Sequence, residues 1–186
     1  MNHLAVNPTL RHISSTKTVT PALRVMWEMR KISRPMFWTG LSLLLLSCLT
    51  LLLTLLDARL FQGVSVWLKP WKFQFSTGVY LLSLVLFMFW LPKEQRQTRA
   101  VKYVVWVAVL SGLFEVGYIT WQGALGKASH FNVATRLDAT MYTLMGVGAV
   151  LLVSASVVLS VVIARSKTYA LQPALKLSIV LGLGIT

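Results

Sequence analysis

The stretch that decides the fold covers residues 36–56 and reads MFWTGLSLLLLSCLTLLLTLL. It contains 21 residues and no charged side chain. As an α-helix it would be roughly 32 Å long, and the hydrocarbon core of a bilayer is about 30 Å thick. This stretch therefore predicts a transmembrane helix.

Three further apolar runs have the length of membrane spans, at about residues 73–91, 103–121 and 140–164. Tryptophan and tyrosine side chains lie at the ends of two of them, as the aromatic belts at membrane interfaces require. A last apolar stretch, residues 175–186, is too short to cross a bilayer and predicts a partial fifth span. We expect the native chain to continue beyond it, because an isolated helix end in lipid leaves carbonyl groups unsatisfied.

Composition supports a membrane protein over a soluble one. Charged residues make up 12% of the 186 residues, whereas soluble domains carry about 25%. The net charge of +13 does not indicate nucleic-acid binding, because the basic residues lie between the apolar runs. We therefore predict an all-α, polytopic transmembrane helix bundle with four spans and a partial fifth.

The first 34 residues divide into two segments that precede the transmembrane domain, which we place at residues 35–186. Residues 1–19 are polar and predict a mobile tail. Residues 20–34 begin with Thr20 and Pro21, a helix start, and continue with apolar and charged residues on opposite faces. This pattern fits an amphipathic helix in the membrane interface, or equally a short cytosolic helix packed on the bundle.

Lysine and arginine are unevenly distributed between the two sides of the predicted bundle. The N-terminal segment, residues 92–102 and residues 165–176 hold thirteen of them, and residues 57–72 and 122–139 hold five. The positive-inside rule places the richer side in the cytoplasm, with an N-terminus inside. Residues 57–72 and 122–139 then form two loops on the outer face.

The first outer loop ends in two lysines that flank a predicted helix start. Pro70 fits the first turn of the second span, and Lys69 and Lys72 lie on either side of it. Free N–H groups and the helix dipole favour anions at such a position. The two lysines thus predict a site for a headgroup or carboxylate, and the simpler alternative is that both extend to the membrane interface.

The second outer loop contains His130, a histidine at the predicted membrane edge, followed by Asn132. Thr135 and Asp138 fit a capping box that opens the fourth span, which explains both. His130 has no such explanation. Histidine can bind a ligand, carry a proton or act as a hydrogen-bond partner in a loop.

Glu115 is the one charged residue inside the third predicted span. A charge in mid-membrane costs about 2.5–3.5 kcal/mol on insertion scales, so such residues face a partner or are neutral. Tyr118 and Gln122 follow on the same helix face, and Glu115 lies six residues before Trp121. We expect Glu115 to meet the outer-loop cations or His130, with a polar stripe of the second span opposite: Ser76, Tyr80 and Ser83.

Two motifs resemble a family of uncharacterised bacterial polytopic inner-membrane proteins. They are WLKPWKF at residues 67–73 and SHFN at residues 129–132, with Glu115 and Gln122 between them. The resemblance covers roughly residues 36–186 and implies a bacterial inner-membrane location and a longer chain. It implies no activity.

These patterns leave several functions open. The first is an outward-facing site that binds or processes an anionic lipid or small molecule, with Glu115 and His130 as candidate catalytic residues. The second is a haem- or quinone-associated redox subunit, and the third is a structural subunit that packs on other membrane subunits. The sequence leaves the cofactor unknown. It predicts no metal site, and phosphate-loop, zinc and nucleophile-elbow motifs are absent from it. The candidate ligand-binding residues are Lys69, Lys72, Tyr118, Gln122 and Asn132.

Overall fold

The structure is a computed structural model that describes residues 21–166 and 172–185. The predicted tail at residues 1–19 lies outside this part of the chain. The described elements are α1 (Pro21–Ile32), α2 (Arg34–Leu56), β1 (Leu60–Phe61), β2 (Val64–Ser65), α3 (Leu68–Met88), the short 3-10 helix η2 (Gln95–Gln97), α4 (Arg99–Ala124), α5 (Arg136–Arg165) and α6 (Pro173–Ile185). Helices α2, α3, α4 and α5 are long and apolar enough to cross a membrane. The predicted all-α architecture with four spans is thus confirmed, and the chain is an integral membrane protein.

Local sequence signals explain where the long helices begin. Thr98 and Thr135 are the N-caps of α4 and α5, and each hydroxyl accepts a hydrogen bond from a backbone N–H three residues later, at 3.4 and 3.1 Å. The Thr135 hydroxyl also donates to Oδ2 of Asp138 at 2.7 Å, so the predicted pairing of these two residues is confirmed. Pro70 is the third residue of α3, in its first turn as predicted.

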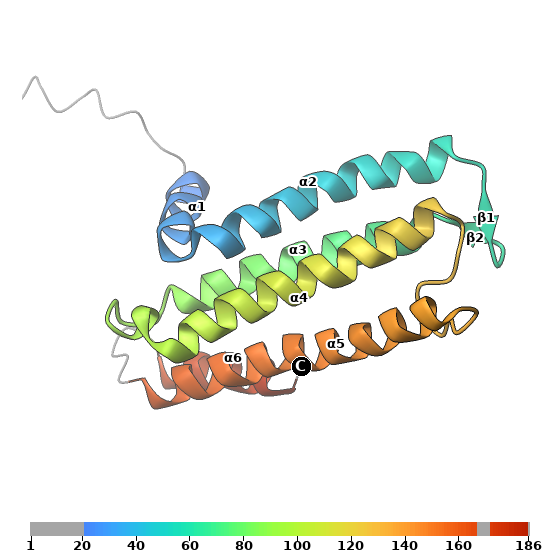
Figure 1. Cartoon of the computed structure of the whole chain (residues 1–186). Helices are drawn as coiled ribbons and strands as arrows, with labels where there is room; N and C mark the ends of the chain where they lie inside the picture. Colours follow the sequence, from blue (N-terminus) through green and yellow to red (C-terminus); the bar gives the residue numbers. More distant parts are fainter. Residues whose placement is uncertain (1–20, 167–171, 186) are drawn as a thin grey trace, which may run out of the picture.

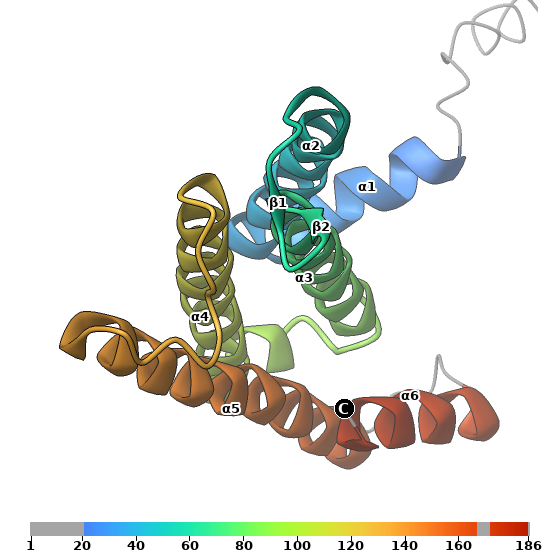
Figure 2. The ribbon, with the colours of Figure 1, turned by 90° about the vertical axis from the view of Figure 1, so that its right-hand side faces the viewer.

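The helices pack in chain order around an open bundle (Figures 1 and 2). Helix α3 packs mainly on α2, α4 lies beside α3, and α5 packs mainly on α4. Helix α6 packs on α5, whereas α3 and α5 make few direct contacts. The seam between α3 and α5 is therefore less tightly closed than the other helix pairs.

Glycines bring α2 and α3 together at one point. A Cβ on Gly40 would lie 3.1 Å from the carbonyl oxygen of Gly78, and a Cβ on Gly78 would lie 3.0 Å from the carbonyl oxygen of Gly40. Small residues let membrane helices approach closely, which gains dispersion contacts between them. This pair fixes the position of α3, the helix that carries Lys69 and Lys72.

The two ends of the bundle differ in structure. At one end, which we call the hairpin end, the antiparallel strands β1 and β2 follow α2, and the loop from α4 to α5 lies nearby (Figure 1). At the other end lie α1, η2 and the end of α5. Helix α1 contacts α2 and α3, with Met29 buried and Val25, Met26 and Trp27 exposed.

Candidate functional site

A cavity of about 630 Å³ opens at the hairpin end of the bundle. We call it the hairpin pocket. The β1–β2 hairpin, the first turns of α3, the end of α4 and residues 126–131 surround it. Its polar side chains include Lys69, Lys72, Lys127, Ser129 and His130. The two motif loops, far apart in the sequence, thus form one site.

A charged cluster holds the hairpin wall of the pocket in place. Asp57 and Arg59 form a salt bridge of 2.6 Å, and the indole N–H of Trp67 donates to Oδ2 of Asp57 at 2.7 Å. Hydrogen bonds from Arg59 and Trp67 hold the pKa of Asp57 well below its usual range. Arg59 also donates to the backbone carbonyl of Ala124 at 2.9 Å, which ties the hairpin to the end of α4.

The turn of the hairpin is a tight one. Gln62 and Gly63 both have positive φ, 51° and 80°, between the paired residues Phe61 and Val64. Two residues of this kind form the turn that matches the twist of a β-hairpin. The pocket wall is therefore a folded element and not a loose loop.

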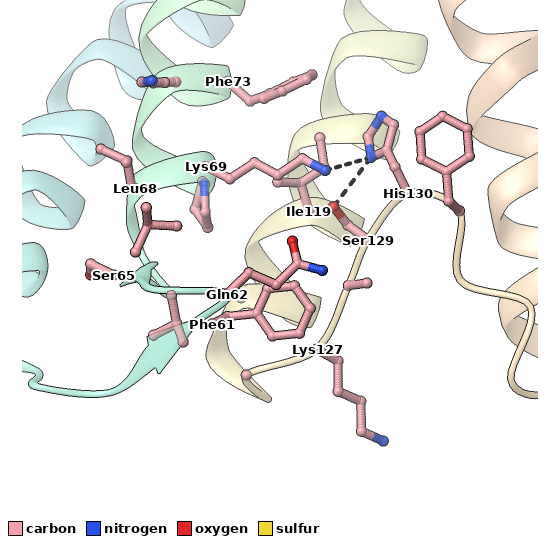
Figure 3. A pocket seen from close by; sticks show the side chains of 18 residues that line it. Phe61, Gln62, Ser65, Leu68, Lys69, Phe73, Ile119, Lys127, Ser129 and His130 are labelled. Atoms are coloured by element: carbon pink, nitrogen blue, oxygen red, sulfur yellow. Dashed lines mark hydrogen bonds between the residues drawn. The ribbon is translucent and has the colours of Figure 1, made fainter.

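Lys69 and His130 meet inside the pocket (Figure 3). Nζ of Lys69 lies 2.8 Å from Nδ1 of His130, and Oγ of Ser129 lies 3.2 Å from the same nitrogen. An ammonium group only donates, so Nδ1 of His130 must be the acceptor and Nε2 must carry the imidazole proton. In Figure 3 the Nε2 edge of the ring points away from Lys69 and Ser129.

The imidazole of His130 also packs among aromatic rings. The ring centroids of Phe73 and Tyr142 lie 5.9 and 6.4 Å from that of His130. Burial, and then the nearby charge of Lys69, lower the pKa of His130 from its usual 6.5. Both effects favour the neutral form of the ring.

Asn132 shapes the loop that carries His130. Its side-chain amide donates to the carbonyl of Ala128 at 3.2 Å, and its Oδ1 accepts from the N–H of Ala134 at 3.1 Å. Phe131 lies between His130 and Asn132 in the sequence. Its φ is positive, 56°, which is rare for a bulky side chain. Asn132 was a candidate ligand-binding residue, and the structure places it in the loop as a support, outside the pocket lining.

The charged side chains that line the hairpin pocket are all positive. Three lysines line it, and no aspartate or glutamate is among its lining residues. The salt bridges of the described residues join Lys31 to Glu28 and Arg59 to Asp57, so they leave these lysines unpaired with carboxylates. Such a pocket attracts anions.

Glu115 lies outside this pocket, in a second cavity of about 240 Å³. We call this the Glu115 cavity. It lies between α3, α4 and α5 and shares only Phe73 with the lining of the hairpin pocket. No salt bridge among the described residues includes Glu115, so the expected pairing with Lys69, Lys72 or His130 is wrong. The reason is depth: α4 continues to Ala124, which puts Glu115 nine residues, or roughly 14 Å, before the helix end.

Tyr118 and Gln122 lie outside both the hairpin pocket and the Glu115 cavity. They line a hollow between α4 and α5 together with Asp138, and Glu115 is not part of it. The amide of Gln122 donates to the Tyr118 hydroxyl at 2.8 Å and to Oδ1 of Asp138 at 3.3 Å. Gln122 therefore connects α4 to the start of α5, and Tyr118 bonds to Gln122 within α4.

Lys127 and Gln74 were not among the residues predicted from the sequence to form a site. Lys127 lines the hairpin pocket, and in Figure 3 its side chain extends away from Lys69 and His130. Its position three residues before His130 in a predicted outer loop was a usable signal. Gln74 is fully buried and bonds Thr50 on α2 and Thr120 on α4, at 2.7 and 3.1 Å. It joins three helices and lies outside both cavities.

Comparison of the chain with protein-family models, with curated proteins and with solved structures gave no match.

Proposed function

We propose that the hairpin pocket binds an anionic amphiphile, either a lipid or a smaller molecule with a phosphate or carboxylate group. The observation that carries this proposal is the lining of the pocket, with Lys69, Lys72 and Lys127 and no acidic side chain. A lysine charge without a carboxylate partner is available to a ligand anion.

The start of α3 adds to this charge. The N-cap residue of α3, Trp67, provides no side-chain hydrogen bond to the first turn, and Leu68 and Lys69 of that turn line the pocket. Unsatisfied N–H groups and the positive end of the helix dipole favour an anion there. Lys69 can donate to a ligand oxygen while His130 accepts another of its three N–H bonds.

The rest of the pocket suits an apolar group. Phe61, Phe73, Ile119 and Phe131 are among its lining residues. Phe131 is 81% exposed, and Leu60 and Val64 of the hairpin are 66% and 50% exposed. Exposed apolar side chains beside a basic pocket are the arrangement expected where a protein meets the polar surface of a bilayer. A ligand with an anionic head and an apolar tail matches both parts.

Binding of hexyl phosphate to the purified full chain in an uncharged detergent tests the proposal. The matched variants are Lys69→Met with Lys72→Met, and Lys93→Met with Lys102→Met at the other end, which lose the same charge. We expect the first pair to weaken binding at least tenfold, since charge-assisted hydrogen bonds contribute about 1.5–3 kcal/mol each. The second pair should leave the affinity unchanged.

Two results would count against the proposal. One is equal affinity in the two double variants, and the other is hexyl phosphate binding no tighter than hexyl glucoside, which has the same tail and no charge. Inorganic phosphate serves as a third ligand, and weaker binding of it than of hexyl phosphate is expected if the apolar wall contributes.

The orientation of the protein is part of the same proposal. We infer that the chain lies in a bacterial inner membrane with its N-terminus in the cytoplasm and the hairpin pocket on the outer face. The support is the excess of lysine and arginine in the segments at the α1 end of the bundle.

A further inference from the structure

The Glu115 cavity contains an ionisable group that the hairpin pocket does not use. Glu115 is 8% exposed, and its Oε1 has no hydrogen-bond partner. The cavity has a volume of about 240 Å³. It is lined by the aromatic residues Phe73 and Tyr80, by three serine or threonine side chains and by apolar residues of α5. A buried carboxyl group thus lines a partly open space between the helices, whose lining also includes hydroxyl oxygen atoms.

The packing around Glu115 makes room for its carboxyl group. A Cβ on Gly148 of α5 would lie 2.9 Å from Oε1 of Glu115. Any larger residue at this position would displace the carboxyl group. Thr77, Ser76 and Ser156 supply hydroxyl groups to the same cavity.

The groups that face Glu115 carry no positive charge. From α3 the one titratable residue in the lining is Tyr80, whose hydroxyl donates to the carbonyl of Leu152 at 2.7 Å and lies 2.9 Å from Oγ of Ser156. Helix α5 contributes no charged residue to the lining. On α4 itself, Tyr118 is one turn away and accepts a hydrogen bond from Gln122. Among the residues that the structure describes, no lysine, arginine or histidine lines this cavity to neutralise a carboxylate.

Cavities lie on both sides of this one along the α3–α5 seam. The hairpin pocket shares Phe73 with it, and a cavity of about 430 Å³ next to α6 shares Tyr80 and Ser156 with it. The α6 cavity is also lined by Ser83 and Ser178. A row of hydroxyl-bearing spaces thus runs from the hairpin pocket to α6, with Glu115 in the middle.

We propose that the Glu115 cavity is a proton-binding site, in which Glu115 takes up and releases a proton in exchange with water along this seam. On uptake an O–H bond forms at the carboxylate and the charge of the site changes from −1 to zero, and release reverses this step. A proton is the ligand because an ionised carboxylate at this depth lacks a cation among the residues that line the cavity, and protonation removes the cost of a charge inside the membrane. The hydroxyl groups around it can accept from the protonated form and donate to the ionised form.

Labelling with dicyclohexylcarbodiimide tests the site, because this apolar reagent reacts with protonated carboxyl groups in apolar surroundings. The purified full chain in detergent is treated over a range of pH, and the adduct is located by peptide mass spectrometry. We expect an adduct at Glu115 that forms more slowly as the pH rises. The Glu115→Gln variant should lose it completely, and the matched Glu94→Gln variant, in the exposed segment before η2, should keep it.

A second measurement covers the case in which the reagent does not reach the cavity. Infrared difference spectra between H₂O and D₂O should contain the carbonyl band of a protonated carboxyl group that is absent from Glu115→Gln. An adduct or a band at Glu115 that depends on pH supports the proposal. The absence of both signals, a signal that does not change with pH, or protection of Glu115 by sodium ions in place of protons would overturn it.

Discussion

His130 contacts both a charged group and aromatic rings. Its Nδ1 accepts from the Lys69 ammonium group at 2.8 Å, and its ring packs near Phe73 and Tyr142. Protonation of the ring would remove the acceptor and place two positive charges side by side. The residue therefore links the charge of the pocket to pH.

We predict opposite effects of acid on stability and on ligand binding. The pKa of His130 is lowered in the folded protein, so the unfolded chain binds a proton more readily, from pH 6.5 downward. Stability should therefore fall as the pH drops below 6.5 and level off once the folded ring is also protonated. Affinity for hexyl sulfate, which does not itself titrate in this range, should rise at a lower pH, where the folded ring takes up its proton and the pocket gains a positive charge.

Thermal unfolding and hexyl sulfate binding, measured over a pH series that extends well below 6.5, test these two effects. His130→Gln keeps a hydrogen-bond acceptor and does not titrate, so both pH dependences should shrink in this variant. If stability and binding in His130→Gln depend on pH as in the native chain, a group other than His130 causes both pH dependences.

At the scale of helices, the sequence predicted the number and kind of elements better than their ends. Helix α3 begins at Leu68, five residues before the predicted span, because an apolar window stops at charged residues. Lys69 and Lys72 instead lie in the first turns of the helix, where long lysine side chains can reach the interface. Capping by Thr135 was predicted correctly because it depends on neighbours in the sequence.

The Gly40–Gly78 contact should be sensitive to size. Gly78→Val should destabilise the protein by about 1–3 kcal/mol, because the new side chain has no space against the α2 backbone. Gly117→Val on α4 is the matched control, since a Cβ on Gly117 meets nothing within 4 Å. Unfolding in mixed micelles measures both, and equal losses in the two variants would contradict a close α2–α3 contact.

The side chain of Gln74 should contribute less to the stability of the protein than the Gly40–Gly78 contact. Gln74→Leu removes hydrogen bonds to Thr50 and Thr120, but both hydroxyls also bond to carbonyls of their own helices, at 3.0 and 2.7 Å. No threonine donor is then left without an acceptor, so we expect a loss of about 0.6–1.7 kcal/mol, as for polar contacts between membrane helices.

The same unfolding experiment in mixed micelles checks this value. Thr54→Ala, which removes an exposed hydroxyl bonded only within α2, should have less effect. A loss in Gln74→Leu no larger than in Thr54→Ala would show that the three-helix contact adds nothing.

At the scale of the whole molecule, part of the candidate site could be predicted from the sequence. Charge counting predicted that the loops with Lys69, Lys72 and His130 share one end, and the structure joins these three residues in one pocket. The position of Glu115 could not be obtained in this way. Its distance from the pocket depends on where α4 ends and on which helix each face meets, and both are set by tertiary packing.

The proposed orientation makes a direct prediction for intact cells. In a Cys48→Ser background, which removes the one native cysteine, Val133→Cys at the hairpin end should react with a membrane-impermeant maleimide. Gln95→Cys in η2 should react only after lysis. Labelling of Gln95→Cys in intact cells would contradict the proposed orientation and place η2 on the outer face.

The measurement that tests the central claim most directly is native mass spectrometry of the full chain with a mixture of phosphatidylglycerol and phosphatidylcholine. We predict that the protein retains phosphatidylglycerol at collision energies that remove phosphatidylcholine, because the lysines of the hairpin pocket hold its phosphate. Lys69→Met with Lys72→Met should lose this preference, and Lys93→Met with Lys102→Met should keep it. Equal retention of the two lipids by the native chain, or the same preference in both double variants, would contradict an anion-binding hairpin pocket.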